Sequence, residues 1–228
     1  MAILLLRLSA PMQSWGSRSR FTERDTEREP TKSGVIGLLC AAMGKPRHEE
    51  GQNDKWPALE NLAGLRMGVR IDREGTILRD YHTAGGGTFP GIKKYGVAKS
   101  SGASPDTVVS NRYYLADAVF LVALEGDKEL LARLNESLDA PVWPLFLGRK
   151  SFPPAEQLKI ETAPKEMGLE DSLLSVPWLL NQKERKRNED IAQLRTVVEC
   201  GIQEEGDPRQ DVPISFELGK RKFGLRRV

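Results

Sequence analysis

The chain has 228 residues, of which 39% are hydrophobic and 29% are charged, and its formal net charge at pH 7 is +2. This composition suits a protein that buries a core, and it excludes an intrinsically disordered chain and a collagen-like fibre. Short apolar runs, a start without a secretory signal, and two cysteines outside any CxxC motif predict a cytoplasmic protein without membrane spans or structural disulfides.

The first part of the chain alternates strand-like and helix-like patterns. Thr31 and Gly44 have the positions of a helix cap and a helix stop, and Glu74-Gly75 is a turn signal. We therefore expect a strand at 2–8, an exposed charged loop at 15–30, a helix at 32–43, a weak helix at 57–63, and a hairpin of two strands at 66–72 and 76–82.

A Gly-rich stretch at 84–110 lacks a sustained period, and such long irregular segments are often functional. Beyond it we expect strands at 108–115 and 118–124, a helix from Asp127 to about 138, a short strand at 145–147, a short helix at 170–174, and final strands at 196–200 and 214–218. The order of elements in the first half resembles the split βαβ, ferredoxin-like arrangement with an inserted hairpin, so the expected fold class is α+β.

Charge is distributed unevenly along the chain. The tail at 220–227 is basic, Lys93, Lys94 and Lys99 lie in the Gly-rich stretch, and acidic residues gather elsewhere. Separate basic and acidic faces suit a protein that binds a polyanion together with protein partners. An ordinary solvated surface is the alternative that charge alone leaves open.

Gly148-Arg149-Lys150-Ser151 is a candidate phosphate-binding segment. Glycine lets a backbone approach a phosphate closely, and amides, two cations and a hydroxyl can then surround it. The spacing is neither that of a Walker A loop nor that of a Rossmann fingerprint. A simple turn with surface charges is the alternative.

A second group of candidate RNA contacts brackets the first strand-to-helix connection. Aromatic stacking combined with basic groups is how proteins bind single-stranded RNA. For Trp15 we favour a core position over stacking, and nearby acidic residues can pair with the two arginines of the group. Its members are Gln13, Trp15, Arg18, Arg20, Lys32 and Ser33.

Catalytic and metal chemistry are weakly indicated. His48 and His82 are the only histidines, so a histidine-based zinc site is not expected, and neither is a cofactor. His82 can act as a general base toward an RNA 2′-hydroxyl, assisted by Tyr81, but we favour a structural or RNA-contacting histidine. GxSxG, HExxH and paired-acid motifs are missing, so the sequence does not indicate an enzyme.

Five ordered segments resemble the CasD-type subunits of type I (I-E-like) CRISPR Cascade complexes, which belong to the RAMP superfamily. The resemblance covers roughly the first two thirds of the chain, and residues from Ala155 onward add little to it. The segments are Leu6-Arg7-Leu8 with Pro11-Met12-Gln13-Ser14-Trp15-Gly16, the run from Pro30 to Leu39, Leu78-Arg79-Asp80-Tyr81-His82-Thr83, Arg112-Tyr113-Tyr114-Leu115-Ala116-Asp117-Ala118, and Leu147-Gly148-Arg149-Lys150-Ser151-Phe152-Pro153.

The resemblance implies a fold and a domain division. It implies an RRM-like (ferredoxin-like) RAMP domain at 1–150 with a long β-hairpin thumb inserted at about 84–110, and a small β-containing C-terminal extension at 151–228. It also adds Arg112 and His82 to the expected RNA contacts, beside the thumb lysines and the Arg149 segment. We expect Lys32, the lysine-bearing arm and Arg149 to form one shared cradle for a sugar-phosphate strand.

The same resemblance implies a function in antiviral defence. CasD-like subunits bind the 5′ handle of the guide RNA, cap the backbone filament, and are expected to contact the backbone subunit, the large subunit and nearby target DNA. Some relatives from minimal systems instead cleave precursor CRISPR RNA without metal. We favour the non-catalytic role here, because His82 has no recognisable partner histidine.

Overall fold

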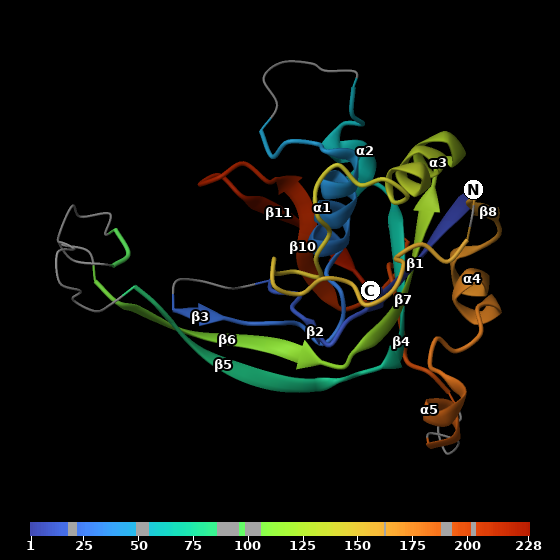
Figure 1. Cartoon of the computed structure of the whole chain (residues 1–228). Helices are drawn as coiled ribbons and strands as arrows, with labels where there is room; N and C mark the ends of the chain where they lie inside the picture. Colours follow the sequence, from blue (N-terminus) through green and yellow to red (C-terminus); the bar gives the residue numbers. More distant parts are fainter. Residues whose placement is uncertain are drawn as a thin grey trace.

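The computed structural model describes residues 1–17, 22–48, 55–85, 96–98, 106–161, 163–187, 193–201 and 204–228. Its main sheet has five strands in the order β8-β1-β7-β4-β9, and every neighbouring pair is antiparallel (Figure 1). These strands are β1 (Ala2–Ser9), β4 (Arg66–Arg73), β7 (Val119–Gly126), β8 (Lys165–Glu166) and β9 (Thr196–Val198). The α+β class with antiparallel sheets is therefore confirmed.

Successive residues of β1 point to opposite faces of this sheet and supply two separate cores. On one face, side chains such as Leu4 and Leu6 pack with those of α1 (Lys32–Met43) and α3 (Lys128–Ser137). On the other face, Ile3 and Leu5 pack with α4 (Leu169–Ser175). The sheet is thus buried on both sides, which explains why β1 is apolar at nearly every position.

Local capping chemistry fixes the two longer helices. The Thr31 hydroxyl accepts a hydrogen bond from the Gly34 amide at 3.3 Å, and the Asp127 carboxylate accepts one from the Leu130 amide at 2.9 Å. Gly44 ends α1 with a φ of 69°, the left-handed conformation that glycine adopts without strain. Both predicted helices are confirmed at these ends.

The remaining helices are short. They are α2 (Leu59–Ala63), predicted as the weak helix, and α5 (Gln182–Arg187), in addition to α4, predicted at 170–174. In the described part of the chain, no helix has the length and apolar character needed to cross a membrane.

A long hairpin forms a second sheet that curves away from the main one (Figure 1). Its strands are β5 (Thr76–Ala84) and β6 (Val108–Ala116), paired antiparallel along their full length. Two short strands flank β6: β2 (Met12–Gln13) runs antiparallel to it and β3 (Glu23–Arg24) runs parallel. Most of the Gly-rich stretch at the end of the hairpin lies outside the described residues.

Two local predictions are wrong. The strands at 66–72 and 76–82 do not pair, because β4 joins the main sheet and β5 pairs with β6. Gly75 does form the turn, with a φ of 71°, but the chain changes sheets there. The expected strand at 145–147 is instead an irregular connection that leads into a turn.

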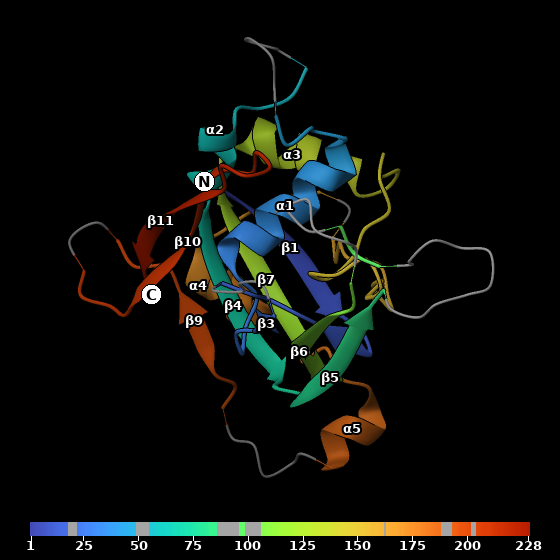
Figure 2. The ribbon, with the colours of Figure 1, turned by 90° about the vertical axis from the view of Figure 1, so that its left-hand side faces the viewer.

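The part of the chain after residue 150 is joined to the part before it. Strands β8 and β9 pair with β1 and β4, so both parts share the main sheet. A final hairpin of β10 (Pro208–Ser215) and β11 (Lys222–Arg227) packs on α1 and α2 (Figure 2). The predicted strand at 214–218 meets only the end of β10, and β11, formed by the basic tail, was not predicted. The division at residue 150 stays a prediction.

The two cysteines are expected to differ in reactivity. Burial raises the pKa of the Cys40 thiol to about 11, whereas Cys200 is half-buried. At pH 8 about one Cys40 side chain in a thousand is a thiolate, the reactive form. A colorimetric thiol reagent should therefore label Cys200 rapidly in the native protein and Cys40 only after unfolding. Rapid labelling of both thiols under native conditions would contradict this burial.

Candidate functional site

The long hairpin carries polar side chains on one of its faces. Arg112 on β6 lies directly opposite Asp80 on β5, and His82 lies opposite Ser110. Residues two apart on a strand share a face, so these four side chains lie together. The parallel pairing of β3 with β6 then places Arg24 beside Arg112.

The turn that begins at Gly148 brings Arg149 to this hairpin. The Leu147 amide donates to the Phe152 carbonyl at 2.8 Å, which closes the turn, and the Ser14 amide donates to the Leu147 carbonyl at 3.1 Å. The Arg149 guanidinium donates to the Tyr113 carbonyl at 2.8 Å and lies 5.5 Å from the Phe152 ring. Two segments far apart in the sequence therefore meet near the middle of the paired strands β5 and β6.

Arg24, Arg112 and Arg149 form what we call the arginine cluster. Burial lowers the pKa of Arg149, and the neighbouring guanidinium groups of Arg112 and Arg24 lower it further, while Asp80 opposes this effect. The pKa of Arg112 is lowered by burial and by Arg24 in the same way. Arginine stays charged at neutral pH. The cluster thus holds three cations close together with one nearby carboxylate.

Such a cluster is suited to a polyanion. Like charges held together by the backbone repel one another, and a bound phosphate relieves that repulsion while accepting charge-assisted hydrogen bonds. Lys150 and Ser151 are exposed on the same turn and can contribute to the binding. The Gly148-Arg149-Lys150-Ser151 segment, a candidate from its own sequence, and Arg112, which the family resemblance added, are therefore brought together.

Gln13 and Trp15 are parts of the scaffold of this site. The Gln13 amide group donates to the Leu8 and Ala118 carbonyls at 3.1 and 2.7 Å, and it accepts from the Trp15 indole at 3.3 Å. Trp15 is 1% exposed. The core position that we favoured for Trp15 is confirmed, and neither side chain is open to a ligand in the isolated chain.

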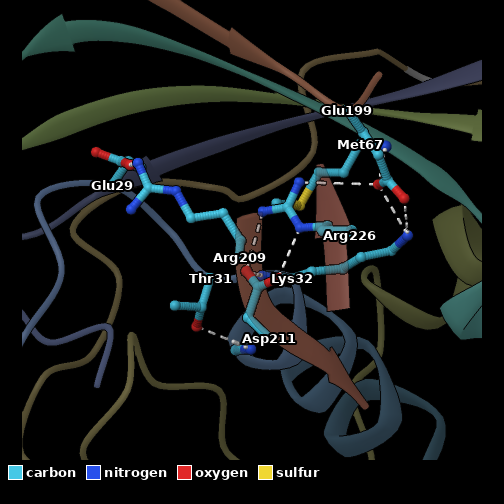
Figure 3. Close-up of polar contacts among 9 residues, drawn as sticks. Glu29, Thr31, Lys32, Met67, Glu199, Arg209, Asp211 and Arg226 are labelled. Carbon is cyan, nitrogen blue, oxygen red and sulfur yellow. Dashed lines mark hydrogen bonds and ion pairs between the residues drawn. The ribbon is translucent and has the colours of Figure 1, made fainter. Parts of the chain in front are cut away.

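Lys32 also has a partner within the protein (Figure 3). Its side chain is 2% exposed, and its ammonium lies 2.8 Å from both carboxylate oxygens of Glu199. Beside this pair, Arg226 donates to both oxygens of Asp211, at 2.7 and 2.9 Å. The expected shared cradle therefore needs correction: the Lys32 ammonium binds Glu199, directly after β9, and does not join the arginine cluster.

The remaining predicted contacts are Ser33 and five basic residues. Ser33 is half-buried in the first turn of α1 and is not part of the arginine cluster. Five predicted basic contacts, Arg18, Arg20, Lys93, Lys94 and Lys99, lie outside the described residues. Arg24, by contrast, was missed by sequence reasoning. The sequence around Arg24 contains no motif that marks it as a binding residue, because only the pairing of β3 with β6 places Arg24 beside Arg112.

The alternative catalytic pair does not share a face. Tyr81 is 64% exposed and adjacent to His82 on β5, so the two side chains point to opposite faces of the hairpin. His82 Nδ1 lies 3.6 Å from the Asp80 carboxylate, with its side chain 41% exposed. This arrangement does not let Tyr81 assist His82 at one scissile bond.

Comparisons with known proteins decide the family. A model of the family described as CRISPR-associated protein (Cas_Cas5) matches residues 3–228. The CRISPR system Cascade subunit CasD of Escherichia coli (strain K12) is 33% identical over 173 residues, which cover 70% of this chain and 70% of that protein. The chain belongs to the CRISPR-associated Cas5 family. The resemblance to CasD-type proteins inferred from five motifs is confirmed.

Solved structures agree with this membership. A structure described as a Cas protein is 36% identical to this Cas5-family chain, with a TM-score of 0.71, and covers 99% of this chain and 91% of its own. A chain of a CRISPR RNA-guided surveillance complex is 33% identical, with a TM-score of 0.75, and the match covers 99% of this chain and 87% of that one. The likeness thus includes the C-terminal part, which the motifs did not reach.

Proposed function

We propose that this Cas5-family chain is a non-catalytic subunit of a CRISPR RNA-guided surveillance complex of the Cascade type, and that it binds the 5′ handle of the guide RNA. The arginine cluster carries this proposal. Arg24, Arg112 and Arg149 gather at the middle of the paired strands of a long hairpin, and a phosphate is the anion that such a group of guanidinium groups binds well. The similarity to CasD and to a surveillance-complex chain supports it.

The fold supports the architectural part of the proposal. The order β8-β1-β7-β4, with α1 following β1 and α3 following β7, is that of a ferredoxin-like βαββαβ unit. The β5–β6 hairpin is inserted between β4 and β7, and its two strands flank the segment at 84–110 where the thumb was expected, which supports the thumb as part of the proposal. In the complex, the chain would cap the backbone filament and contact the backbone subunit and the large subunit, with target DNA nearby.

Removing the cluster's charges is expected to weaken RNA binding. Arg149→Ala and Arg112→Ala should each lower affinity for a handle-containing single-stranded RNA by about tenfold or more, because a charged hydrogen bond contributes about 1.5–3 kcal/mol. The slope of log K against log salt should also become shallower by about 0.7 for each phosphate that is no longer neutralised. Fluorescence anisotropy with labelled RNA at several salt concentrations measures both quantities.

Lys128→Ala is the matched control for these variants. Lys128 is an exposed cation at the start of α3 that pairs with Glu166 on β8, and neither of these elements contributes a residue to the arginine cluster. It should leave affinity and salt slope unchanged. If the two arginine variants behave like this control, the cluster is not the RNA site. Cleavage of repeat RNA in EDTA that requires His82 would overturn the non-catalytic assignment.

A further inference from the structure

An exposed tryptophan stands out in the connection between α3 and the Gly148 turn. Trp143 is 43% exposed and lies in a run of exposed apolar residues at 140–144. The indole N–H groups of Trp15, Trp56 and Trp178 donate to Gln13 Oε1, the Met43 carbonyl and the Asp72 carbonyl. Trp143 is the tryptophan whose indole N–H makes no such bond within the described part of the chain.

The backbone holds this tryptophan firmly. The Val142 amide donates to the Ala42 carbonyl at 2.9 Å, and the Trp143 amide donates to the Ala41 carbonyl at 3.2 Å. Pro141 and Pro144 flank the pair and restrict the backbone further. A large aromatic side chain that is carried by an anchored backbone and left partly open to solvent suits a recognition residue, because the backbone loses little entropy when the ring binds.

The position of Trp143 connects it to the arginine cluster. The connection after α3 contacts α1 through the Val142 and Trp143 amides, and it reaches the end of β2 where the Ser14 amide donates to the Leu147 carbonyl. Figure 1 shows this connection passing beside α1. Arg149 is six positions after Trp143, a span of at most ~22 Å. A single strand held at the arginine cluster can therefore reach Trp143 within a few nucleotides.

We propose that Trp143 is a stacking platform for an unpaired base of the RNA strand whose phosphates bind the arginine cluster. This inference rests on the proposed function and extends its site along α1. Sites for single-stranded nucleic acid combine cationic groups, which follow the backbone, with aromatic rings, on which bases stack. The cluster supplies the first component, and among the described side chains near the turn Trp143 supplies the second. An apolar pocket on a partner protein is the competing occupant.

The test uses the full chain and a labelled single-stranded RNA carrying the repeat-derived handle. Trp143→Ala is expected to lower affinity by about tenfold, whereas Trp143→Tyr retains most of it, since tyrosine also stacks. Because stacking involves no charge, the salt slope should stay unchanged in Trp143→Ala, unlike in Arg149→Ala. RNA should also quench tryptophan fluorescence in the natural chain, and Trp143→Ala should remove that part of the quenching.

The outcomes separate this proposal from the function on which it rests. Val142→Ala is the control, because it changes the neighbouring exposed apolar side chain without removing a ring. If Arg149→Ala weakens binding and Trp143→Ala does not, the stacking role is wrong and the RNA site stands. If neither variant weakens binding, the proposed RNA-binding function is itself wrong, and the stacking proposal falls with it. Loss of a protein subunit from the co-purified complex, with RNA affinity intact, would assign Trp143 to a protein interface and overturn the proposal.

Discussion

Replacing Glu199 with alanine is expected to destabilise the folded protein by about 3 kcal/mol, because it leaves a buried ammonium without its partner. Burial is the main influence that lowers the pKa of Lys32, and Glu199 provides the largest opposing effect. Breaking a buried pair costs about 3–5 kcal/mol. We expect the lower end because the Glu199 side chain is 17% exposed, so water can partly replace the lost carboxylate beside Lys32. The variant also removes the acceptor of the Met67 amide, 3.2 Å away. Urea unfolding measures the loss.

Two further variants test whether the unpaired charge causes this loss. Lys32→Met combined with Glu199→Leu removes both charges, and it should recover more than half of the stability lost in Glu199→Ala. Glu166→Ala, which breaks an exposed pair with Lys128, should change stability very little. If Glu166→Ala and Glu199→Ala prove equally mild, the ion pair in Figure 3 is not buried as described.

The pH dependence gives an independent check on Glu199→Ala. The pKa of Lys32 in the folded protein lies below its ordinary value of 10.5, so between these two values the unfolded chain binds more protons. Stability contributed by this group therefore rises with pH across that window. Removing Glu199 lowers the folded-state pKa further and widens the window. The stability deficit of the variant should consequently shrink as the pH is raised toward 10.5.

Features that depend on neighbouring residues could be predicted from the sequence. Thr31 and Asp127 cap helices through amides three residues ahead, so the signal and the structure lie in one short segment. The strands at 2–8 and 118–124 are likewise marked by their own apolar runs. The Arg149 turn belongs to the same class, because Gly148 and the adjacent residues identify it locally.

Features that depend on distant partners could not be predicted in the same way. A lysine at the start of a helix is usually solvated, and only the folded chain brings Glu199, 167 residues away, to Lys32. Arg24 sits in a charged segment that looks like an exposed loop, and parallel pairing with β6 turns it into part of a site. Arg226 is buried for a similar reason, because Asp211 on the neighbouring strand binds it in two places.

The turn at Glu74-Gly75 shows a third kind of limit. Its sequence correctly marks a reversal of the backbone, but a turn signal does not specify the partner of the strand that follows. Strand β5 pairs with β6, across the whole Gly-rich stretch, while β4 has β7 and β9 as neighbours. Which strands become neighbours depends on the complete sheet and cannot be read from the turn alone.

Gly148→Ala is expected to disrupt the arginine cluster as well as the fold around it. Gly148 has a φ of 91°, and a Cβ atom there would lie 1.7 Å from the Ser14 carbonyl oxygen. The turn must move to relieve this clash, and Arg149 then loses its bond to the Tyr113 carbonyl. We expect a loss of about 3 kcal/mol in stability, combining backbone strain with the displaced turn. RNA affinity should fall at least as far as in Arg149→Ala.

Gly219→Ala is the control that separates the cost of backbone strain from the cost of the steric clash with Ser14. Gly219 has a similar φ of 82°, but a Cβ atom there would meet nothing within 4 Å. It should cost only the backbone strain, about 1–2 kcal/mol, and leave RNA affinity unchanged. Because both variants replace a positive-φ glycine with alanine, the difference between them isolates the contact with Ser14. Equal losses of stability and of RNA affinity in Gly148→Ala and Gly219→Ala would mean that the Gly148 turn does not depend on its close approach to the Ser14 carbonyl. The position of Arg149 beside Arg112 would then need another explanation.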